Sequence, residues 1–186
     1  MRKSNEEAAR TRQTIVATAA DEIRRLGIAE ASVADVMAAA GLTPGGFYRH
    51  FENKDQLVAE ALEQAGDRVA GNLRAVLAKG QFDDVVDAYI NPENTDGKST
   101  PACPISALGS EIARSGPETR EAITKVMEEM FSILGSGSGG SKVSRRNGIF
   151  TLAVLVGSLT LARIGTDEDT SREILNVVRQ KLHRAG

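Results

Sequence analysis

A short run near the middle of the first third of the chain combines side chains that bind phosphate with residues too small to block a close approach. Tyr48 can donate a hydrogen bond to a phosphate oxygen, and Lys54 can neutralise its charge. His50 lies between them in the sequence. The preceding run, residues 43–46, is Thr-Pro-Gly-Gly, so its backbone can come close to the edges of bases. These residue types favour binding to a nucleic acid.

Two short helices joined by a turn are needed to position this run. Ser32 precedes an apolar pattern and is expected to be a helix N-cap, with Asp35 in the capping-box position. Gly41 ends that helix, and Pro44 can begin the next because its missing N–H is not needed there. A longer amphipathic helix, expected over about 6–26, is the third helix and packs against the other two. Three such helices form the helix-turn-helix arrangement, whose second helix can enter a major groove.

The rest of the chain has the period of helices throughout, and the predicted fold class is all-α. We expect a helix-turn-helix head over residues 1–53 and a helical ligand-binding and dimerisation domain over 54–186. Helices are expected over 54–65 and 69–77, 82–90, 105–113, 117–134, 145–164 and 170–182. Residues 91–103 are predicted to form a loop, and the Gly/Ser run 135–141 a flexible connector.

The net charge of the chain does not by itself indicate nucleic-acid binding. The chain carries 23 basic and 25 acidic residues, and residues 1–57 carry eight of each. DNA binding therefore requires the two signs to lie on different faces. We expect few phosphate contacts per chain, so that useful affinity needs a dimer.

The sequence excludes several other kinds of site. Cys103 is the one cysteine, so no internal disulfide can form, and His50 and His183 are not at metal-ligand spacing from it. We expect no metal and no cofactor. The longest apolar run, 149–161, is interrupted by polar and glycine residues and falls short of the roughly 20 residues of a membrane span. The expected location is the cytoplasm, with no membrane contact.

The run from Ser32 to Leu57 resembles the DNA-binding signature of TetR-family repressors. The resemblance covers about residues 8–62, and its tail Gly-Phe-Tyr-Arg-His-Phe-Glu-Asn-Lys-Asp-Gln-Leu is highly specific. It implies a three-helix head, a connecting helix, and a C-terminal helical domain that dimerises and carries an inducer pocket. A weaker similarity to one TetR subgroup covers residues 102–112 and does not fix a ligand. The phosphate-contacting positions that the resemblance implies are Ser32, Thr43, Tyr48, His50 and Lys54, with Pro44, Gly45 and Gly46 near the bases.

Alternatives stay open at several of these positions. Arg10 and Arg12 could reach the DNA backbone or minor groove from the chain start, or could form an ordinary solvated helix face. Tyr48 could cap the edge of the core, and His50 could be a packing histidine.

The pocket residues are expected to come from the apolar faces of the C-terminal helices. Few aromatic residues, 4% of the chain, favour a largely apolar ligand. Cys103 could be a thiol sensor, but a small buried apolar side chain is the simpler interpretation. The same faces could equally be plain core. The expected pocket residues are Phe82, Tyr89, Cys103, Ile105, Leu108, Ile112, Met127, Met130 and Phe131.

The last two helices are the expected dimer interface. The first of them is apolar on more than one face, so a second subunit could cover what the chain's own core does not. The alternative is a helix buried centrally within one chain. The expected interface residues are Leu152, Val156, Gly157, Thr160, Ile174 and Val178.

The leading hypothesis is a homodimeric repressor that binds a palindromic DNA operator and responds to a small-molecule inducer. A small enzyme is the first rival, but the sequence has no Gly-rich phosphate loop, nucleophile elbow or metal-ligand cluster. A ligand-binding or interaction protein that uses the same head without reading DNA is the second rival.

Overall fold

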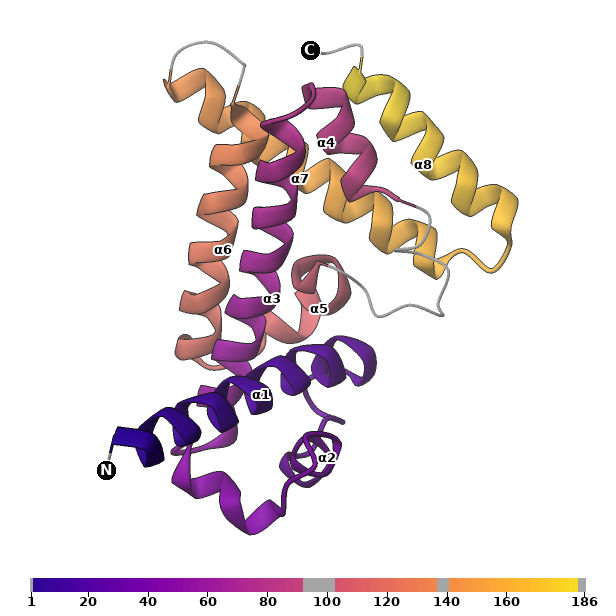
Figure 1. Ribbon diagram of the computed structural model, residues 1–186. Coiled ribbons are helices and arrows are strands. Elements are labelled where there is room, and N and C mark those ends of the chain that lie inside the picture. Colours follow the sequence, from indigo (N-terminus) through magenta and orange to yellow (C-terminus); the bar gives the residue numbers. More distant parts are fainter. Residues whose placement is uncertain (1, 92–102, 137–140, 184–186) are drawn as a thin grey trace.

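The computed structural model describes residues 2–91, 103–136 and 141–183, and all regular structure in these ranges is helical (Figure 1). The predicted all-α class is therefore confirmed. The loop expected at 91–103 and the Gly/Ser run at 135–141 lie largely outside the described residues. The elements are α1 (Arg2–Leu26), α2 (Val33–Ala39), η1 (Pro44–Arg49), α3 (Lys54–Leu77), α4 (Phe82–Tyr89), α5 (Pro104–Ile112), α6 (Pro117–Gly135), α7 (Ser141–Ile164) and α8 (Glu168–His183).

The head consists of α1, α2 and η1, closed by the first turns of α3. Its core residues come from all four elements, among them Ile15, Val36, Phe47 and Leu57, each at most 1% exposed. The same cluster continues into α5, so the head and the remainder of the chain share one apolar core. Figure 1 shows α1 lying across the lower ends of α3 and α5.

Local signals set the boundaries of the head helices. The Ser32 hydroxyl accepts from Asp35 N at 3.1 Å, which confirms the predicted N-cap of α2. Gly41 follows α2 with φ of +72°, a conformation that favours glycine. The second helix of the pair differs from the expectation, because η1 is a short 3₁₀ helix. Six residues that include two glycines gain too little from α-helical bonding, and 3₁₀ geometry is typical of such short pieces.

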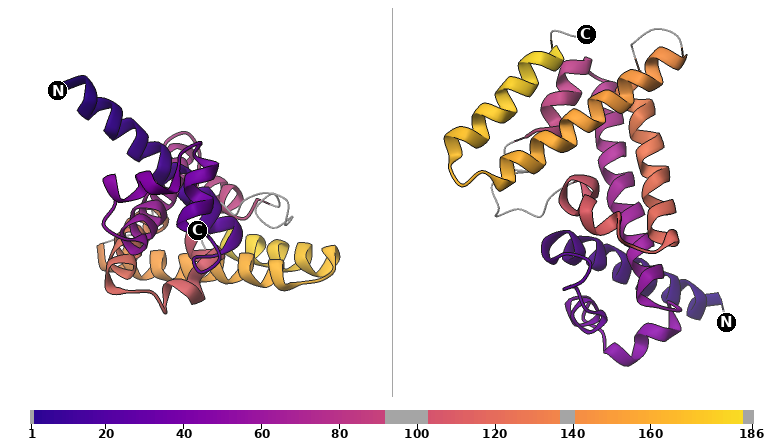
Figure 2. Two further views of the ribbon diagram at one scale, coloured as in Figure 1. Left: turned by 90° about the horizontal axis from the view of Figure 1, so that it is seen from below. Right: turned by 180° about the vertical axis from the view of Figure 1, so that it is seen from behind.

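The larger part of the molecule is built on α3 and α6, which lie side by side (Figure 1). Residues expected as two helical stretches form the single helix α3. A second core cluster joins α3, α4, α6, α7 and α8 around Leu73, Val86, Leu134, Leu155 and Leu159. Seen from behind in Figure 2, α7 and α8 run side by side at the end of the molecule away from the head.

The expectation that no apolar segment is long enough to span a membrane is wrong for helix α7. The segment Ser144–Ile164 is long and apolar enough to cross a membrane by length and composition alone. Core helices pass the same test, and α7 packs against α5, α6 and α8. Its threonine and serine residues do not interrupt the apolar character, because Thr160 and Ser158 each donate a hydrogen bond to a backbone carbonyl of their own helix.

The close approach of α3 and α6 depends on Gly66. A Cβ at this position would lie 2.4 Å from Val126 Cγ1, well inside contact distance. Valine has few alternative rotamers in a helix, so α6 would have to move away. Gly71, on the same helix α3, is exposed, and a Cβ there would meet no atom within 4 Å.

These two glycines give a matched pair of predictions. We expect Gly66→Ala to lower the free energy of unfolding by about 1–3 kcal/mol through overpacking. Gly71→Ala is expected to raise it by up to about 1 kcal/mol, because alanine is the better helix former. Urea titrations of both variants and the parent at one protein concentration measure the difference. A Gly66→Ala protein as stable as Gly71→Ala would show that α3 and α6 do not pack this closely.

Candidate functional site

One face of η1 is anchored in the core while the other is open to solvent. Phe47 is 1% exposed and stacks on Phe51 with ring centroids 5.4 Å apart. Tyr48 packs edge-on against Phe47 at 5.2 Å, yet remains 78% exposed. Its hydroxyl therefore faces outward on a ring that the core holds in place. The alternative of Tyr48 as a capping residue at the core edge accounts for its ring contact but not for its exposure.

The start of η1 is bare backbone. Gly45 is exposed, and a Cβ there would meet no atom within 4 Å. A Cβ on Gly46 would lie 3.6 Å from Met37 Cε, an ordinary contact. Neither glycine has a positive φ. The fold thus requires neither glycine, although each weakens a helix. Thr43 and Pro44 beside them are exposed, and the Thr43 side chain makes no capping hydrogen bond to η1.

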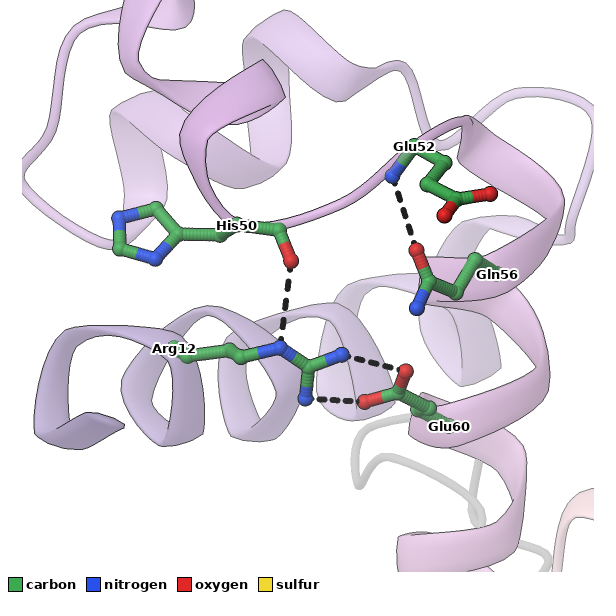
Figure 3. Close-up of polar contacts among 5 residues, drawn as sticks. All are labelled: Arg12, His50, Glu52, Gln56 and Glu60. Carbon is green, nitrogen blue, oxygen red and sulfur yellow. Dashed lines mark hydrogen bonds and ion pairs between the residues drawn. The ribbon is translucent and has the colours of Figure 1, made fainter. Parts of the chain in front are cut away.

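Arg12 has partners within the protein, and a DNA contact by it stays a prediction. Its guanidinium forms a bidentate ion pair with Glu60 of α3, and its Nε donates to the His50 carbonyl at 3.2 Å (Figure 3). The guanidinium also lies over the Phe51 ring, 4.5 Å from its centroid. Hydrogen bonding to Glu60 raises the pKa of Arg12. Arg12 therefore ties α1 to the end of η1 and to α3.

The remaining expected DNA contacts have mixed placements. His50 is half-buried, and Figure 3 shows its carbonyl, rather than its ring, directed at the Arg12 guanidinium. Arg10 is exposed, and its Nε donates to the Glu6 carbonyl on the same helix at 3.4 Å. The Ser32 hydroxyl caps α2 and contacts the Asp35 carboxylate. A DNA contact by any of these three residues stays a prediction.

Lys54 and Glu111 hold the turn after α1 from two sides. Glu111 on α5 accepts from Ile28 N at 2.7 Å and from Ala29 N at 3.4 Å. Lys54 Nζ donates to the carbonyl oxygens of the same two residues, at 2.7 and 3.3 Å. Gly27, with φ of +97°, leaves room for the Glu111 carboxylate, since a Cβ there would lie 3.0 Å from its Oε1. The Lys54 ammonium thus makes two hydrogen bonds within the protein, and its contact with a phosphate stays a prediction.

A cavity of about 190 Å³ lies between α3, α4, α5 and α7, in the half of the molecule away from η1. It is smaller than the usual site for a drug-sized molecule, and its lining is mostly apolar. Asn72, Tyr89 and Cys103 give it a polar end. The lining residues are Val69, Asn72, Leu73, Ala88, Tyr89, Cys103 and Leu159.

The expected pocket residues divide between the cavity lining and the packed cores. Tyr89 and Cys103 line the cavity, and the other members of the set are core or packing residues. Leu108 and Ile112 face the head cluster, while Met130 is buried in the second cluster. The remaining members, Phe82, Ile105, Met127 and Phe131, are half-buried and pack against the cores. Helical periodicity identified apolar faces but could not tell which part of each face is filled.

The polar end of the cavity has its own hydrogen bonds. The Tyr89 hydroxyl donates to Cys103 Sγ at 3.0 Å, and both residues are buried. Burial raises the pKa of Tyr89 well above its usual value, and the nearby Cys103 adds to that effect. Arg163 of α7 donates to the Ser106 carbonyl at 3.0 Å, one turn beyond Cys103. Burial lowers the pKa of Arg163, while Cys103 and Tyr89 oppose that shift.

The outer face of α7 is an exposed apolar stripe. Phe150, Leu161 and Ile164 are 61%, 57% and 70% exposed. Of the expected interface residues, Val156, Gly157, Ile174 and Val178 are half-buried and Thr160 is exposed. Leu152 is 3% exposed within the chain's own core, and the expected interface stays a prediction. Because α7 is apolar on both faces, the pattern could not distinguish the inner face from the outer one.

The comparisons with known proteins agree with this architecture. The family model described as bacterial regulatory proteins, tetR family, matches residues 15–61. The HTH-type transcriptional regulator TtgR of Pseudomonas putida is 38% identical over 63 residues, which are 34% of this chain and 30% of that protein. The matched part thus spans less than a third of TtgR. An HTH-type transcriptional regulator of Mycobacterium tuberculosis is 28% identical over 171 residues, covering 84% of this chain and 86% of that one.

Solved structures extend the similarity to nearly the whole chain. A TetR transcriptional regulator from Chloroflexus aurantiacus superposes with a TM-score of 0.74 at 26% identity, covering 98% of this chain and 97% of the other. The reduced form of NemR from Escherichia coli gives a TM-score of 0.76 at 18% identity, covering 91% and 95%, and shows the shared fold. Residues 15–61 thus match the tetR family model, and the chain as a whole is similar to a TetR transcriptional regulator of known structure.

Proposed function

We propose that this protein is a cytoplasmic transcriptional repressor that binds a palindromic DNA operator as a homodimer and releases it when a small, largely apolar ligand binds. The observation that carries the proposal is the open face of η1. It presents bare backbone at Gly45 and an outward hydroxyl at Tyr48, on an element whose inner side is fixed by Phe47. Such a face suits close approach to a duplex, with hydrogen bonds to its phosphates.

Gly45 gives the first test of DNA binding. Gly45→Leu is expected to leave stability nearly unchanged, because its side chain enters open space, but to weaken operator binding by about tenfold or more by blocking the approach of the backbone. Gly71→Leu is the matched control, since that position is equally open but lies on α3 beyond the head. The measurement is fluorescence anisotropy on duplexes from the upstream region of the protein's own gene, at several salt concentrations.

Two outcomes would contradict this part of the proposal. Equal binding by the two variants would show that η1 does not approach the DNA closely. A folded protein that prefers no DNA sequence at low salt would favour the rival function, an interaction protein that keeps the head without reading DNA.

The outer stripe of α7 supports the homodimer. An apolar face of this extent is costly to leave in water, and a two-fold partner would cover it with the same residues. Gly157, whose Cβ position meets no atom within 4 Å, lies on this helix and would allow two copies of α7 to pack closely. A dimer would also place two heads on one duplex, which supplies the affinity that a single head with balanced charge lacks.

The dimer interface is tested by Leu161→Glu. A glutamate there would face its own copy across a two-fold axis, so we expect the dimer dissociation constant to rise by roughly tenfold or more. Leu26→Glu is the control, because Leu26 is an exposed leucine outside the stripe, at the end of α1. Sedimentation equilibrium at several concentrations measures both. If Leu161→Glu dimerises like the parent, the interface lies elsewhere.

Ligand response would pass from the cavity to the head through α5. Cys103 lines the cavity just before the first turn of α5, and Glu111 in its last turn holds the backbone after α1. A molecule that shifts the first turn of α5 would thus pull on the amides of Ile28 and Ala29. Since DNA requires one separation of the two heads, a ligand that favours another separation weakens DNA binding, and the coupling is reciprocal.

Reciprocity allows this coupling to be measured without knowing the ligand. The rate at which iodoacetamide alkylates Cys103 is expected to differ about fivefold or more between free and operator-bound protein. Glu111→Ala is expected to bring that ratio close to one, because the head and α5 lose their direct link. Glu121→Ala, the same change at an exposed position on α6, should keep the parent ratio. An unchanged ratio in Glu111→Ala would contradict a route through this carboxylate.

A further inference from the structure

We propose that Arg49 is the side chain that reads a base in each half of the operator, and that the base is a guanine. This inference rests on the proposed DNA-binding function and assigns its sequence preference to one residue. Arg49 is the last residue of η1 and is exposed. No pattern in the sequence marks it, since its charge is one of eight positive charges in residues 1–57.

Among the positive side chains of the head that the structure describes, Arg49 is the one with no intramolecular partner. Three arginines of α1 form ion pairs, and Lys54 is bonded to backbone carbonyls. Arg10 donates to the backbone of its own helix. No hydrogen bond, ion pair or ring contact of Arg49 is found within residues 2–91, 103–136 and 141–183. The three paired arginines and their partners are Arg12 with Glu60, Arg24 with Asp21, and Arg25 with Glu22.

The position of Arg49 in η1 places it next to the exposed Tyr48 and one turn from the glycines. A 3₁₀ helix has three residues per turn, so residues i and i+3 lie one above the other. Tyr48 therefore lies one turn beyond the open Gly45. Arg49 is exposed and lies one turn beyond Gly46, whose Cβ position is 3.6 Å from Met37 Cε. Phe47 between them is buried and fixes the rotation of the element.

Few other side chains of η1 can recognise a base. Pro44, Gly45, Gly46 and the buried Phe47 carry no side-chain donor, so Tyr48 and Arg49 are the residues of η1 that can form directed hydrogen bonds. A tyrosine hydroxyl donates one hydrogen bond and suits a phosphate oxygen. The arginine fork donates two in parallel, which matches O6 and N7 of guanine in the major groove. The most specific contact available to η1 is therefore arginine to guanine.

The test is a selection with the full-length chain from a pool of duplexes with a random core. The parent is expected to enrich a palindrome with a guanine fixed at one position of each half. Replacing that G·C pair by A·T should weaken parent binding by roughly ten- to hundredfold per half. Arg49→Ala should bind both duplexes alike and lose the guanine from its selected consensus. Arg49→Lys keeps the charge but lacks the two parallel donors of the guanidinium. It should therefore also lose the preference for G·C over A·T.

Arg25→Ala is the control, because it removes an equal charge from an exposed arginine of the head that is paired with Glu22. It should keep the guanine preference. If Arg49→Ala keeps that preference while all duplexes weaken together and the salt slope falls by about one, Arg49 binds a phosphate and the inference is overturned with the repressor function intact. If the parent enriches no sequence at all, the proposed function itself fails, and the inference with it.

Discussion

The arrangement of the molecule depends on a turn whose polar backbone groups are shared between two distant side chains. Glu111 accepts hydrogen bonds from the backbone amides of Ile28 and Ala29. Lys54 donates hydrogen bonds to the carbonyl oxygens of the same two residues. Ile28 lies 83 residues from Glu111 and 26 residues from Lys54 in the sequence. A charged partner makes each of these hydrogen bonds stronger than a neutral one. Without them the turn would leave backbone groups unsatisfied where α1, α3 and α5 meet. The orientation of the head relative to α5 follows from this turn.

Helix α5 extends that constraint to the cavity. Its nine residues make a rod of about 13 Å, with Cys103 directly before it and Glu111 near its other end. Leu108 and Ile112 on the same helix pack into the head cluster. Helix α5 therefore contacts the head through apolar side chains as well as through the hydrogen bonds of Glu111. A short helix held at both ends transmits displacement more readily than it absorbs it, because bending it would break its own hydrogen bonds. The cavity and η1 are therefore linked through packed elements rather than through loops.

Local features of this fold were predictable from sequence, and non-local ones were not. The cap at Ser32 and the turn at Gly41 follow from rules that act within four residues, and both are found where expected. The bonds of Arg12 to Glu60 and of Lys54 to Ile28 were not predictable, because these partners lie 48 and 26 residues away and no pattern in the sequence marks them. Most of the cavity lining was not predicted for the same reason, although Tyr89 and Cys103 were among the expected residues. Apolar spacing tells that a face is buried, but the space left between several buried faces depends on how helices cross.

Charge pairing within the head explains how a domain with no net charge can still present a face to DNA. Ion pairs along α1 and the start of α3 join Arg12, Arg24 and Arg25 to carboxylates on the body of the head, so both signs cancel away from η1. The element η1 itself carries no acidic residue and one arginine. The charge of η1 itself is thus positive, although the sum over the head is zero and the exposed Glu52 follows shortly after it. With so few free cations, long-range attraction contributes little, and recognition has to come from close contact with the backbone and from a small number of directed hydrogen bonds. Relying on close contacts rather than on long-range attraction favours sequence selectivity over affinity. Two heads on one duplex can then supply the affinity.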